Sequence, residues 1–478
     1  MTAPTNFKLI QQPPDHTKTV LIPFFQSTAD ISSWTSFPVP ASFTGKRDQW
    51  FQVYDSEKAM NVLVLGLGEQ KTFSTVHQVF HRFLVQLRDQ LLDGILVDLS
   101  HLDPSVVYHC VLGIDSSQYA IGAYKTESQD KVGVGTIELL VKDANQDLIR
   151  EAQHTAAVVN RIRYLVDAPA NVKTPQFLAD WALESASEYG YRVEIFEHQQ
   201  LKQENLHALM AVGHGSENPP VLIKAHYNHT DRDSGTDLGL VGKGVTFDTG
   251  GLSLKKPNNM HYMKSDMGGA AAVLGAMELI ARLRLPISVT AVIPVAENSV
   301  DAHSFRPGDV ISSYSGKTIE VIDTDAEGRL ILADALTFIQ SNYHPKTLVD
   351  LATLTGSCVA ALGYEAAGLF SNDQHLVQTL IEAGDQTGER VWNLPLWESY
   401  ADALHSDIAD VKNLSGKPVA GAITAAKFLE YFVDEDQVWA HLDIAGVAFG
   451  DTDHAKMKSA TGYGVRLLVE LAKSLIGK

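Results

Sequence analysis

A short acidic segment contains the residues of this chain whose types and spacing are best suited to chemistry. Asp323, Asp325, Glu327 and Arg329 occupy alternate positions directly before an apolar stretch. Residues two apart in an extended or turn conformation project to the same side of the chain. Asp325 and Glu327 could therefore present both carboxylates to one metal cation. The same pair could instead cap the helix that follows and interact with its dipole, and the segment alone leaves both hypotheses open.

Further charged residues lie about 60 to 80 positions upstream, in glycine-rich and otherwise apolar sequence. They are Lys243, Asp248, Lys255 and Asp266. The apolar run over 238–241 predicts a strand that glycines end, and the alanines and leucines of 267–283 predict a helix. The charged side chains therefore lie at predicted strand ends and helix starts, which is where α/β proteins place their ligand sites.

The elements that must position these residues predict an α/β protein of two domains. Residues 1–148 mix short strand-like runs, such as 61–66, with helix-like stretches, such as 80–92. Residues 149–172 form a connecting helix and linker. In 173–478 helices and strands alternate, which predicts a larger domain with a mainly parallel central sheet flanked by helices. The alternating segments are 175–189, 221–226, 238–241, 267–283, 287–295, 330–340 and 348–351.

Composition excludes several classes of protein. The 478 residues are 45% hydrophobic and 20% charged, which is typical of a globular protein. The net charge of −19 disfavours nucleic acid as a partner, because phosphate contacts need clustered Lys or Arg. The bases Lys46, Arg47 and Arg82 are scattered, so they do not favour an additional DNA-binding role. Two cysteines, Cys110 and Cys358, supply neither a disulfide framework nor a metal cluster.

Targeting segments and rival catalytic motifs are also absent from the sequence. The first residues contain no apolar signal-peptide core, and no stretch approaches 18 consecutive apolar residues. We therefore expect a cytoplasmic protein without a membrane partner. The motifs His-Glu-x-x-His, Gly-x-Ser-x-Gly and Gly-x-x-x-x-Gly-Lys-Ser/Thr do not occur. A two-metal phosphoesterase remains an alternative, because carboxylate-rich sites also hydrolyse phosphate esters.

Three segments carry a specific resemblance to a known family. Residues 242–248 read Gly-Lys-Gly-Val-Thr-Phe-Asp, residues 263–271 read Met-Lys-Ser-Asp-Met-Gly-Gly-Ala-Ala, and residues 323–330 read Asp-Thr-Asp-Ala-Glu-Gly-Arg-Leu. Together they resemble, in this order, the motifs of the leucine aminopeptidases, also called cytosol aminopeptidases. The similarity covers roughly the last two thirds of the chain. It continues through 163–171, 306–309, 350–356, 439–446 and 460–466.

The resemblance implies a catalytic domain over 173–478 that holds two divalent metal ions, behind a noncatalytic N-terminal domain. One ion would be bound by Lys243, Asp248, Asp266 and Glu327, and the other by Asp248, Asp325 and Glu327. Zn²⁺ or Mn²⁺ is expected, although oxygen donors also suit Mg²⁺ and Co²⁺. A lysine ligand must be neutral, so the cation would have to depress its pKa strongly.

The resemblance also implies an aminopeptidase mechanism in a homo-hexamer. A water bridging the two ions would attack the first peptide bond of a substrate whose N-terminus is free. Lys255 would stabilise the oxyanion, and Arg329 would hold a bicarbonate that acts as general base. Leucine or another apolar side chain is the expected preference. The apolar pocket would be formed by Met263, Thr353, Gly356 and Ala445, with the backbone of Leu354 near the substrate.

Asp323 departs from the family pattern, which usually has Asn at this position. An extra carboxylate beside Asp325 could tighten metal binding or shift its pH dependence, because neighbouring like charges raise each other's pKa. Asp323 could instead form the same turn that Asn would form, since both residue types suit such turns. We favour the turn.

Overall fold

The computed structural model describes residues 7–12, 17–26, 39–56, 58–69, 73–126, 134–142, 146–229 and 235–476. The chain divides into two compact units. The first comprises Met1–Asn160 and Thr452–Met457, and the second comprises Arg161–Asp451 and Lys458–Lys478. Helix α3 (Gln146–Asp167) includes the division between them. Among the described residues, no helix is both long and apolar enough to cross a membrane.

The first unit contains a six-stranded sheet in the order β1-β6-β5-β2-β4-β3. All neighbouring strands are parallel except β3 and β4. Helices α1 and α2 and the start of α3 share one apolar core with the sheet. The strands are β1 (Phe7–Ile10), β2 (Thr19–Phe24), β3 (Trp50–Asp55), β4 (Met60–Gly66), β5 (Ile95–Asp98) and β6 (Ile137–Leu140), and the helices are α1 (Phe73–Leu87), the 3₁₀ turn η2 (Arg88–Gln90) and α2 (Pro104–Ser116).

The helix predicted over 80–92 is displaced from its true bounds. Helix α1 begins at Phe73 and ends at Leu87, and a 3₁₀ turn follows. The early part of α1 is rich in β-branched residues, which disfavour a helix locally. Val76 and Val79 are nonetheless completely buried in the core, so tertiary packing overrides this local preference.

The second unit contains a nine-stranded sheet in the order β16-β15-β18-β14-β9-β11-β8-β7, with β10 also paired to β11. The central strands β18, β14, β9 and β11 are parallel, and antiparallel pairs lie toward the edges. The strands are β7 (Arg192–Phe196), β8 (Val221–Asn228), β9 (Leu238–Gly242), β10 (Gly244–Asp248), β11 (Ser288–Asn298), β14 (Thr347–Ala352), β15 (Ala367–Ser371), β16 (Val391–Asn393) and β18 (Val438–Asp443). The predicted α/β class with a mainly parallel sheet is confirmed.

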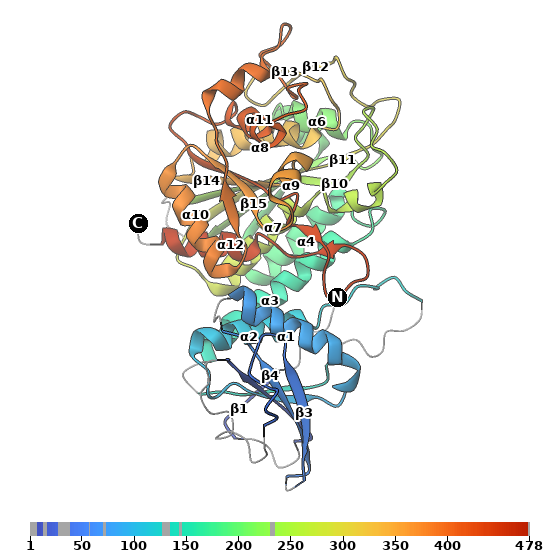
Figure 1. Ribbon diagram of the computed structural model, residues 1–478. Helices are drawn as coiled ribbons and strands as arrows, with labels where there is room; N and C mark the ends of the chain where they lie inside the picture. The colour runs from blue at the N-terminus through green and yellow to red at the C-terminus, as the bar shows by residue number, and fades with distance from the viewer. Residues whose placement is uncertain are drawn as a thin grey trace. The chain divides into compact units, whose positions relative to one another are not determined.

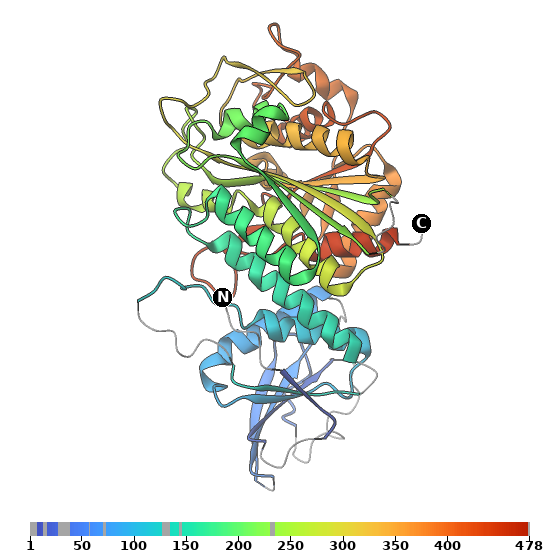
Figure 2. The ribbon, with the colours of Figure 1, turned by 180° about the vertical axis from the view of Figure 1, so that it is seen from behind.

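Helices cover both faces of this sheet (Figures 1 and 2). Helix α7 packs on β9 and β14 together with α4 and α12, whereas α8 packs on β9 and β11 together with α6 and α11. The helices are α4 (Pro175–Tyr189), α5 (His198–Gln203), α6 (His207–Gly213), η4 (Met260–Ser265), α7 (Gly268–Leu283), α8 (Glu327–Tyr343), α9 (Gly356–Leu362), α10 (Gln374–Thr387), η5 (Glu398–Leu404), α11 (Gly421–Glu430) and α12 (Val465–Leu475). Short ladders join β12 (Val310–Ser312), β13 (Thr318–Glu320) and β17 (Val411–Lys412), and β19 (Phe449–Gly450) with β20 (Ser459–Ala460).

The predicted segments of the second unit all exist, because their local signals agree with their burial. Helix α4 has the predicted bounds: the Thr174 hydroxyl accepts a hydrogen bond from the Phe177 amide, and Pro175 lies in the first turn. Strand β11 is a long apolar run buried on both faces, as is typical of a central strand. The carboxyl ends of the parallel strands β9, β14 and β18 meet at one edge of the sheet, where the charged residues lie.

Gly269→Ala tests the close approach of α7 to this edge. A Cβ at Gly269 would lie 2.0 Å from the carbonyl oxygen of Leu351 and 2.9 Å from the amide nitrogen of Lys243. Both are backbone atoms that cannot rotate away. We expect the clash to exceed the roughly 1 kcal/mol that alanine adds in a helix and to lower the free energy of unfolding by about 1–3 kcal/mol.

Urea denaturation would measure this loss, with Gly450→Ala as the matched control. A Cβ at Gly450 meets no atom within 4 Å. Equal stability of the two variants would contradict a tight contact between α7 and β14.

Candidate active site

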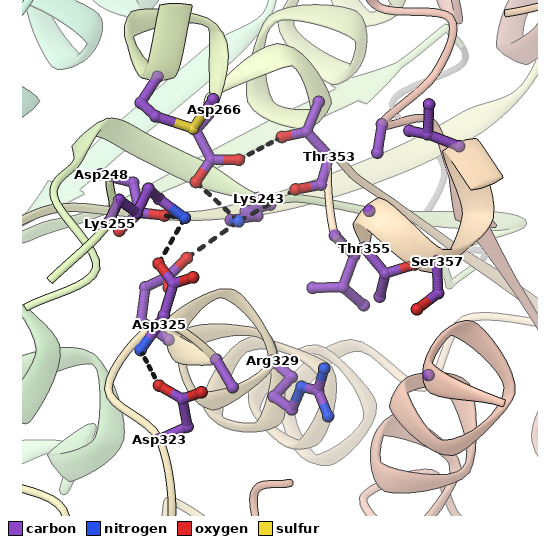
Figure 3. Close-up of a pocket in the computed structure, with 18 of the residues that line it drawn as sticks. Lys243, Asp248, Lys255, Asp266, Asp323, Asp325, Arg329, Thr353, Thr355 and Ser357 are labelled. Carbon is purple, nitrogen blue, oxygen red and sulfur yellow. Dashed lines mark hydrogen bonds and ion pairs between the residues drawn. The ribbon is translucent and has the colours of Figure 1, made fainter. Parts of the chain in front are cut away.

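Every charged or pocket residue predicted from the sequence lines one cavity of about 540 Å³ in the second unit (Figure 3). These residues are Lys243, Asp248, Lys255, Met263, Asp266, Asp325, Glu327, Arg329, Thr353, Leu354, Gly356 and Ala445, and Asp323 joins them. The sequence analysis also missed lining residues, among them Ser265, Ser357, Val359, Leu414 and Phe449. These are small or apolar residues in loops and helix starts, where the sequence carries no distinguishing signal.

Sheet topology brings distant segments to this cavity. Lys243 follows the last residue of β9, Asp248 ends β10, Thr353 follows β14, and Ala445 lies two positions after β18. Parallel strands place their carboxyl ends at the same edge of a sheet, and ligand sites of α/β proteins form there. The cavity is therefore a consequence of strand order.

The first turn of α8 adds Glu327 and Arg329 to the cavity. The N-cap residue of α8 is Ala326, and no side chain caps the helix. The alternative that Asp325 or Glu327 caps this helix is therefore wrong, whereas the expected interaction of an acid with the helix dipole is met by Glu327 in the first turn. Glu327 is 1% exposed, and its Oε2 atom has no hydrogen-bond partner in the described parts of the chain.

Lys243 joins two carboxylates on one side of the cavity. Its Nζ atom lies 2.7 Å from Asp266 Oδ2 and 3.0 Å from Glu327 Oε1, and it donates a hydrogen bond of 3.1 Å to the Thr353 carbonyl. The Thr353 hydroxyl donates to Asp266 Oδ1 over 2.7 Å. Lys243 is only 3% exposed, so these interactions form with little water.

Lys255 joins the other two carboxylates. Its Nζ atom lies 2.8 Å from Asp248 Oδ2 and also pairs with Asp325 Oδ1. The second oxygen of Asp248 accepts hydrogen bonds of 2.8 Å from the Gly250 amide and from Asn298 Nδ2. Figure 3 shows the two lysine ammonium groups lying between the carboxylates.

Burial and mutual repulsion shift the pKa values of the acids upward. Burial first, and then the charge of Asp248, raises the pKa of Asp266 to about 6 and that of Glu327 to about 8. The pKa of Asp325 is raised for the same two reasons. Burial lowers the pKa of Lys243, but the neighbouring carboxylates outweigh it, so the net pKa is raised.

This donor set fits a divalent cation. Oxygen atoms of Asp248, Asp325 and Glu327 lie within 4.8 Å of one another. Four carboxylates share only two ammonium groups, so the site holds more acidic groups than its lysines can neutralise. The partnerless Glu327 Oε2 offers a further donor atom. Carboxylate oxygens are ligands for Zn²⁺, Mn²⁺ and Mg²⁺ alike.

Two supporting residues were not identified from the sequence. A Cβ at Gly328 would lie 2.4 Å from Lys243 Cε and 2.7 Å from its Nζ, so only glycine lets the lysine reach its partners. Asn413 accepts a hydrogen bond from the Ile322 amide and donates one of 2.7 Å to the Asp323 carbonyl. Asn413 lies about 90 positions away in sequence, so only the fold could reveal its contact.

Arg329 lies apart from the acidic cluster. Its Nη1 atom donates a 2.7 Å hydrogen bond to the Asn413 carbonyl, and its Nε atom is buried without a partner among the described residues. Burial lowers the pKa of Arg329 to about 10. A small anion in the cavity would supply both a hydrogen-bond acceptor and a compensating charge.

Asp323 makes the turn that we favoured for it. Its Oδ1 atom accepts a hydrogen bond of 2.9 Å from the Asp325 amide, two residues ahead. Asn would form the same turn with its carbonyl oxygen.

Asp443 supports the part of the cavity wall that Leu354, Thr355 and Ala445 form. Its carboxylate accepts hydrogen bonds from the Thr355 hydroxyl at 2.6 Å, the Ala445 amide at 3.2 Å and the Leu354 amide at 3.3 Å. One buried carboxylate therefore joins the loops that follow β14 and β18. Met263 also lines the cavity and adds apolar surface to it.

Comparison with known proteins identifies the family. Residues 160–469 match the model of the cytosol aminopeptidase family, catalytic domain. A probable cytosol aminopeptidase of Chlorobium limicola is 40% identical over 437 residues, covering 87% of this chain and 86% of the relative. One of Syntrophotalea carbinolica is 46% identical over 369 residues, covering 76% and 73%. The chain belongs to the cytosol aminopeptidase family.

Solved structures of similar proteins match nearly the whole length of the chain. A tomato leucine aminopeptidase mutant superposes with a TM-score of 0.86 at 31% identity, covering 98% of this chain and 96% of that one. The bottromycin maturation enzyme BotP in complex with Mn has a TM-score of 0.84 at 32% identity, covering 96% and 99%. The chain is therefore a metallopeptidase of the leucyl aminopeptidase type, and the family resemblance is confirmed.

Stability of the metal-depleted aminopeptidase should depend on pH in a defined direction. The native pKa values of Asp266 and Glu327, about 6 and about 8, exceed the ordinary values of these acids. The native state therefore binds more protons than the unfolded state, so its extra stability is complete below about pH 4 and is lost as the pH rises through 6 to 8. Each unit of pKa difference corresponds to about 1.4 kcal/mol.

Urea unfolding of EDTA-treated protein between about pH 5.5 and 8.5 would measure this slope. With saturating Mn²⁺ the slope should flatten or reverse, because the cation replaces the protons. A metal-depleted protein that becomes more stable across this range would contradict the assignment.

Proposed function

We propose that this chain removes the N-terminal residue from peptides with a free amino group and prefers leucine or another apolar residue there. The observation that carries the proposal is the single cavity in which four carboxylates and two lysines face an apolar wall. The acidic side suits metal ions, and the apolar side suits a side chain of leucine size. Membership of the aminopeptidase family supports this combination of a metal site and an apolar pocket.

We assign the ligands of two divalent ions to the acidic cluster. Lys243, Asp248, Asp266 and Glu327 would hold one ion, and Asp248, Asp325 and Glu327 the other. Mn²⁺ or Zn²⁺ is expected, and the Mn complex of BotP supports the first. When bound, such ions lower the pKa of a water and polarise a carbonyl. Lys243 would then be neutral, and Lys255 would be released from the carboxylates that it now pairs with.

The chain's own residues orient the substrate around this cluster. Lys255 lies beside Asp248 and Asp325, so its ammonium group can stabilise the oxyanion that develops on the scissile carbonyl. Arg329, with its partnerless Nε, would hold a bicarbonate, which supplies a proton acceptor when bound. Met263, Thr353, Gly356 and Ala445, with the Leu354 backbone, would surround the first side chain. Val359 and Phe449 also line the cavity and add to its apolar surface.

The proposal extends to the domains, the oligomeric state and the location of the protein. Residues 173–478 form the catalytic domain, 149–172 the connection, and 1–148 a noncatalytic domain. We expect a homo-hexamer, for which the exposed Trp392 and Trp397 in the second unit offer apolar contact area. A cytoplasmic location agrees with the names of the curated relatives.

Loss of one carboxylate charge at a time tests the ligand set. Asp325→Asn and Glu327→Gln keep the side-chain shapes, so we expect folded proteins that bind less metal and lose about 100-fold or more of kcat/KM on leucine p-nitroanilide. Asp407→Asn is the matched control, because Asp407 is fully exposed outside the cavity. Elemental analysis and circular dichroism on each protein complete the test. Full activity in a metal-depleted variant would overturn the ligand set.

The requirement for a free amino group tests the exopeptidase assignment. Leucine p-nitroanilide should be cleaved, whereas N-acetyl-leucine p-nitroanilide should not, because an amide nitrogen is a poor metal ligand. Nitrophenyl phosphate should also be inert, which separates the peptidase from the two-metal phosphoesterase. Efficient cleavage of the acetylated substrate would show that the enzyme does not require an N-terminus.

A further inference from the structure

The charge of Asp323 has no role in the turn that its side chain makes. Only Oδ1 accepts the hydrogen bond from the Asp325 amide, and the carbonyl oxygen of an asparagine would accept it equally. The turn therefore requires the shape of the side chain and leaves its negative charge available for another interaction.

The backbone holds Asp323 in a fixed position at the cavity wall. Its amide donates to Asn413 Oδ1 at 3.3 Å, and its carbonyl accepts from Asn413 Nδ2 at 2.7 Å. The side chain is partly exposed and lines the cavity. A charge fixed in this way costs little side-chain entropy when it binds a ligand.

No cation of the described chain forms an ion pair with this carboxylate. Asp323 forms no ion pair with any residue that the structure describes, whereas Lys243 and Lys255 each pair with two other acids. Arg329 donates to the Asn413 carbonyl, and the charge of Asp323 acts on it without a direct ion pair. Burial lowers the pKa of Arg329, and Asp323 is one of the charges that partly raise it again. The negative charge of Asp323 is thus partly exposed at the cavity and not held in a salt bridge by any described residue.

The position of Asp323 indicates which part of a substrate it would meet. Figure 3 shows Asp323 beyond Asp325, on the side of the acidic cluster opposite Thr353 and Thr355. If the first side chain of the substrate occupies the wall near Thr353, and the scissile carbonyl lies at the cluster, the rest of the peptide extends toward Asp323. This step depends on the function proposed above.

We propose that Asp323 determines specificity for the residue after the scissile bond and favours lysine or arginine there. A long cationic side chain reaches the wall from the peptide backbone and pairs with the carboxylate. A glutamate at the same substrate position is repelled. The preferred substrates are therefore peptides with an apolar first residue and a basic second residue.

The test compares three amidated dipeptides, Leu-Lys-NH₂, Leu-Met-NH₂ and Leu-Glu-NH₂, on the metal-loaded wild type and on Asp323→Asn. The amide removes the C-terminal charge, and asparagine keeps the turn. In the wild type we expect kcat/KM for the lysine substrate to exceed that for the methionine substrate by about fivefold, the size of a solvent-accessible ion pair. The ratio should fall to about one in the variant, and the glutamate substrate should improve.

Salt and metal content separate this effect from others. Raising the ionic strength to about 1 M, where the screening length is ~3 Å, should shrink the lysine preference of the wild type. If Asp323→Asn keeps the wild-type ratio of kcat/KM for the lysine substrate to kcat/KM for the methionine substrate, the inference is wrong. This holds also if the variant binds less metal but keeps that ratio. A wild type that cleaves none of the three peptides would instead refute the proposed aminopeptidase function.

Discussion

Repulsion among four carboxylates, three of them buried, is the constraint on which the rest of the site depends. Asp248, Asp266, Asp325 and Glu327 face one cavity, and burial raises the cost of every negative charge among them. Positive charge must lie between them if they are to remain ionised. Lys243 and Lys255 supply part of it, and the remaining excess is the reason that the cluster suits divalent ions. In an enzyme that bound no cation, a site with this many carboxylates would lower the stability of the folded protein.

Close packing and hydrogen bonds of the surrounding residues hold these charged groups near one another. Backbone atoms approach closely at Gly269, and Lys243 passes over Gly328, where any side chain would displace it. Asn298 donates a hydrogen bond to Asp248, and Asn413 forms hydrogen bonds with the backbone amide and carbonyl of Asp323. Asp443 likewise forms hydrogen bonds with residues of the apolar wall. Polar support on both sides holds the acidic cluster and the apolar lining residues in one cavity.

The extent of prediction from sequence differs between elements. Helix α4 carried an N-terminal Thr-Pro signal and was predicted with its true bounds, whereas α1 was displaced because the burial of Val76 and Val79 overrides their poor helix propensity. The charged residues of the site were identifiable because their spacing forms motifs. Asn413 was not, because its contacts with the Asp323 loop join segments about 90 positions apart.

The sequence by itself determined the α/β class and the charged residues, since both depend on patterns within short segments. It also determined the resemblance to a metallopeptidase family. It left open whether Asp325 and Glu327 cap a helix, because a carboxylate near a helix start satisfies either role. Tertiary structure decided against the cap, gave Asp323 its turn, and placed Asp323 in the cavity beyond Asp325, on the side away from Thr353 and Thr355. Those outcomes depend on which strand ends meet, and strand order is set by long-range packing rather than by local spacing.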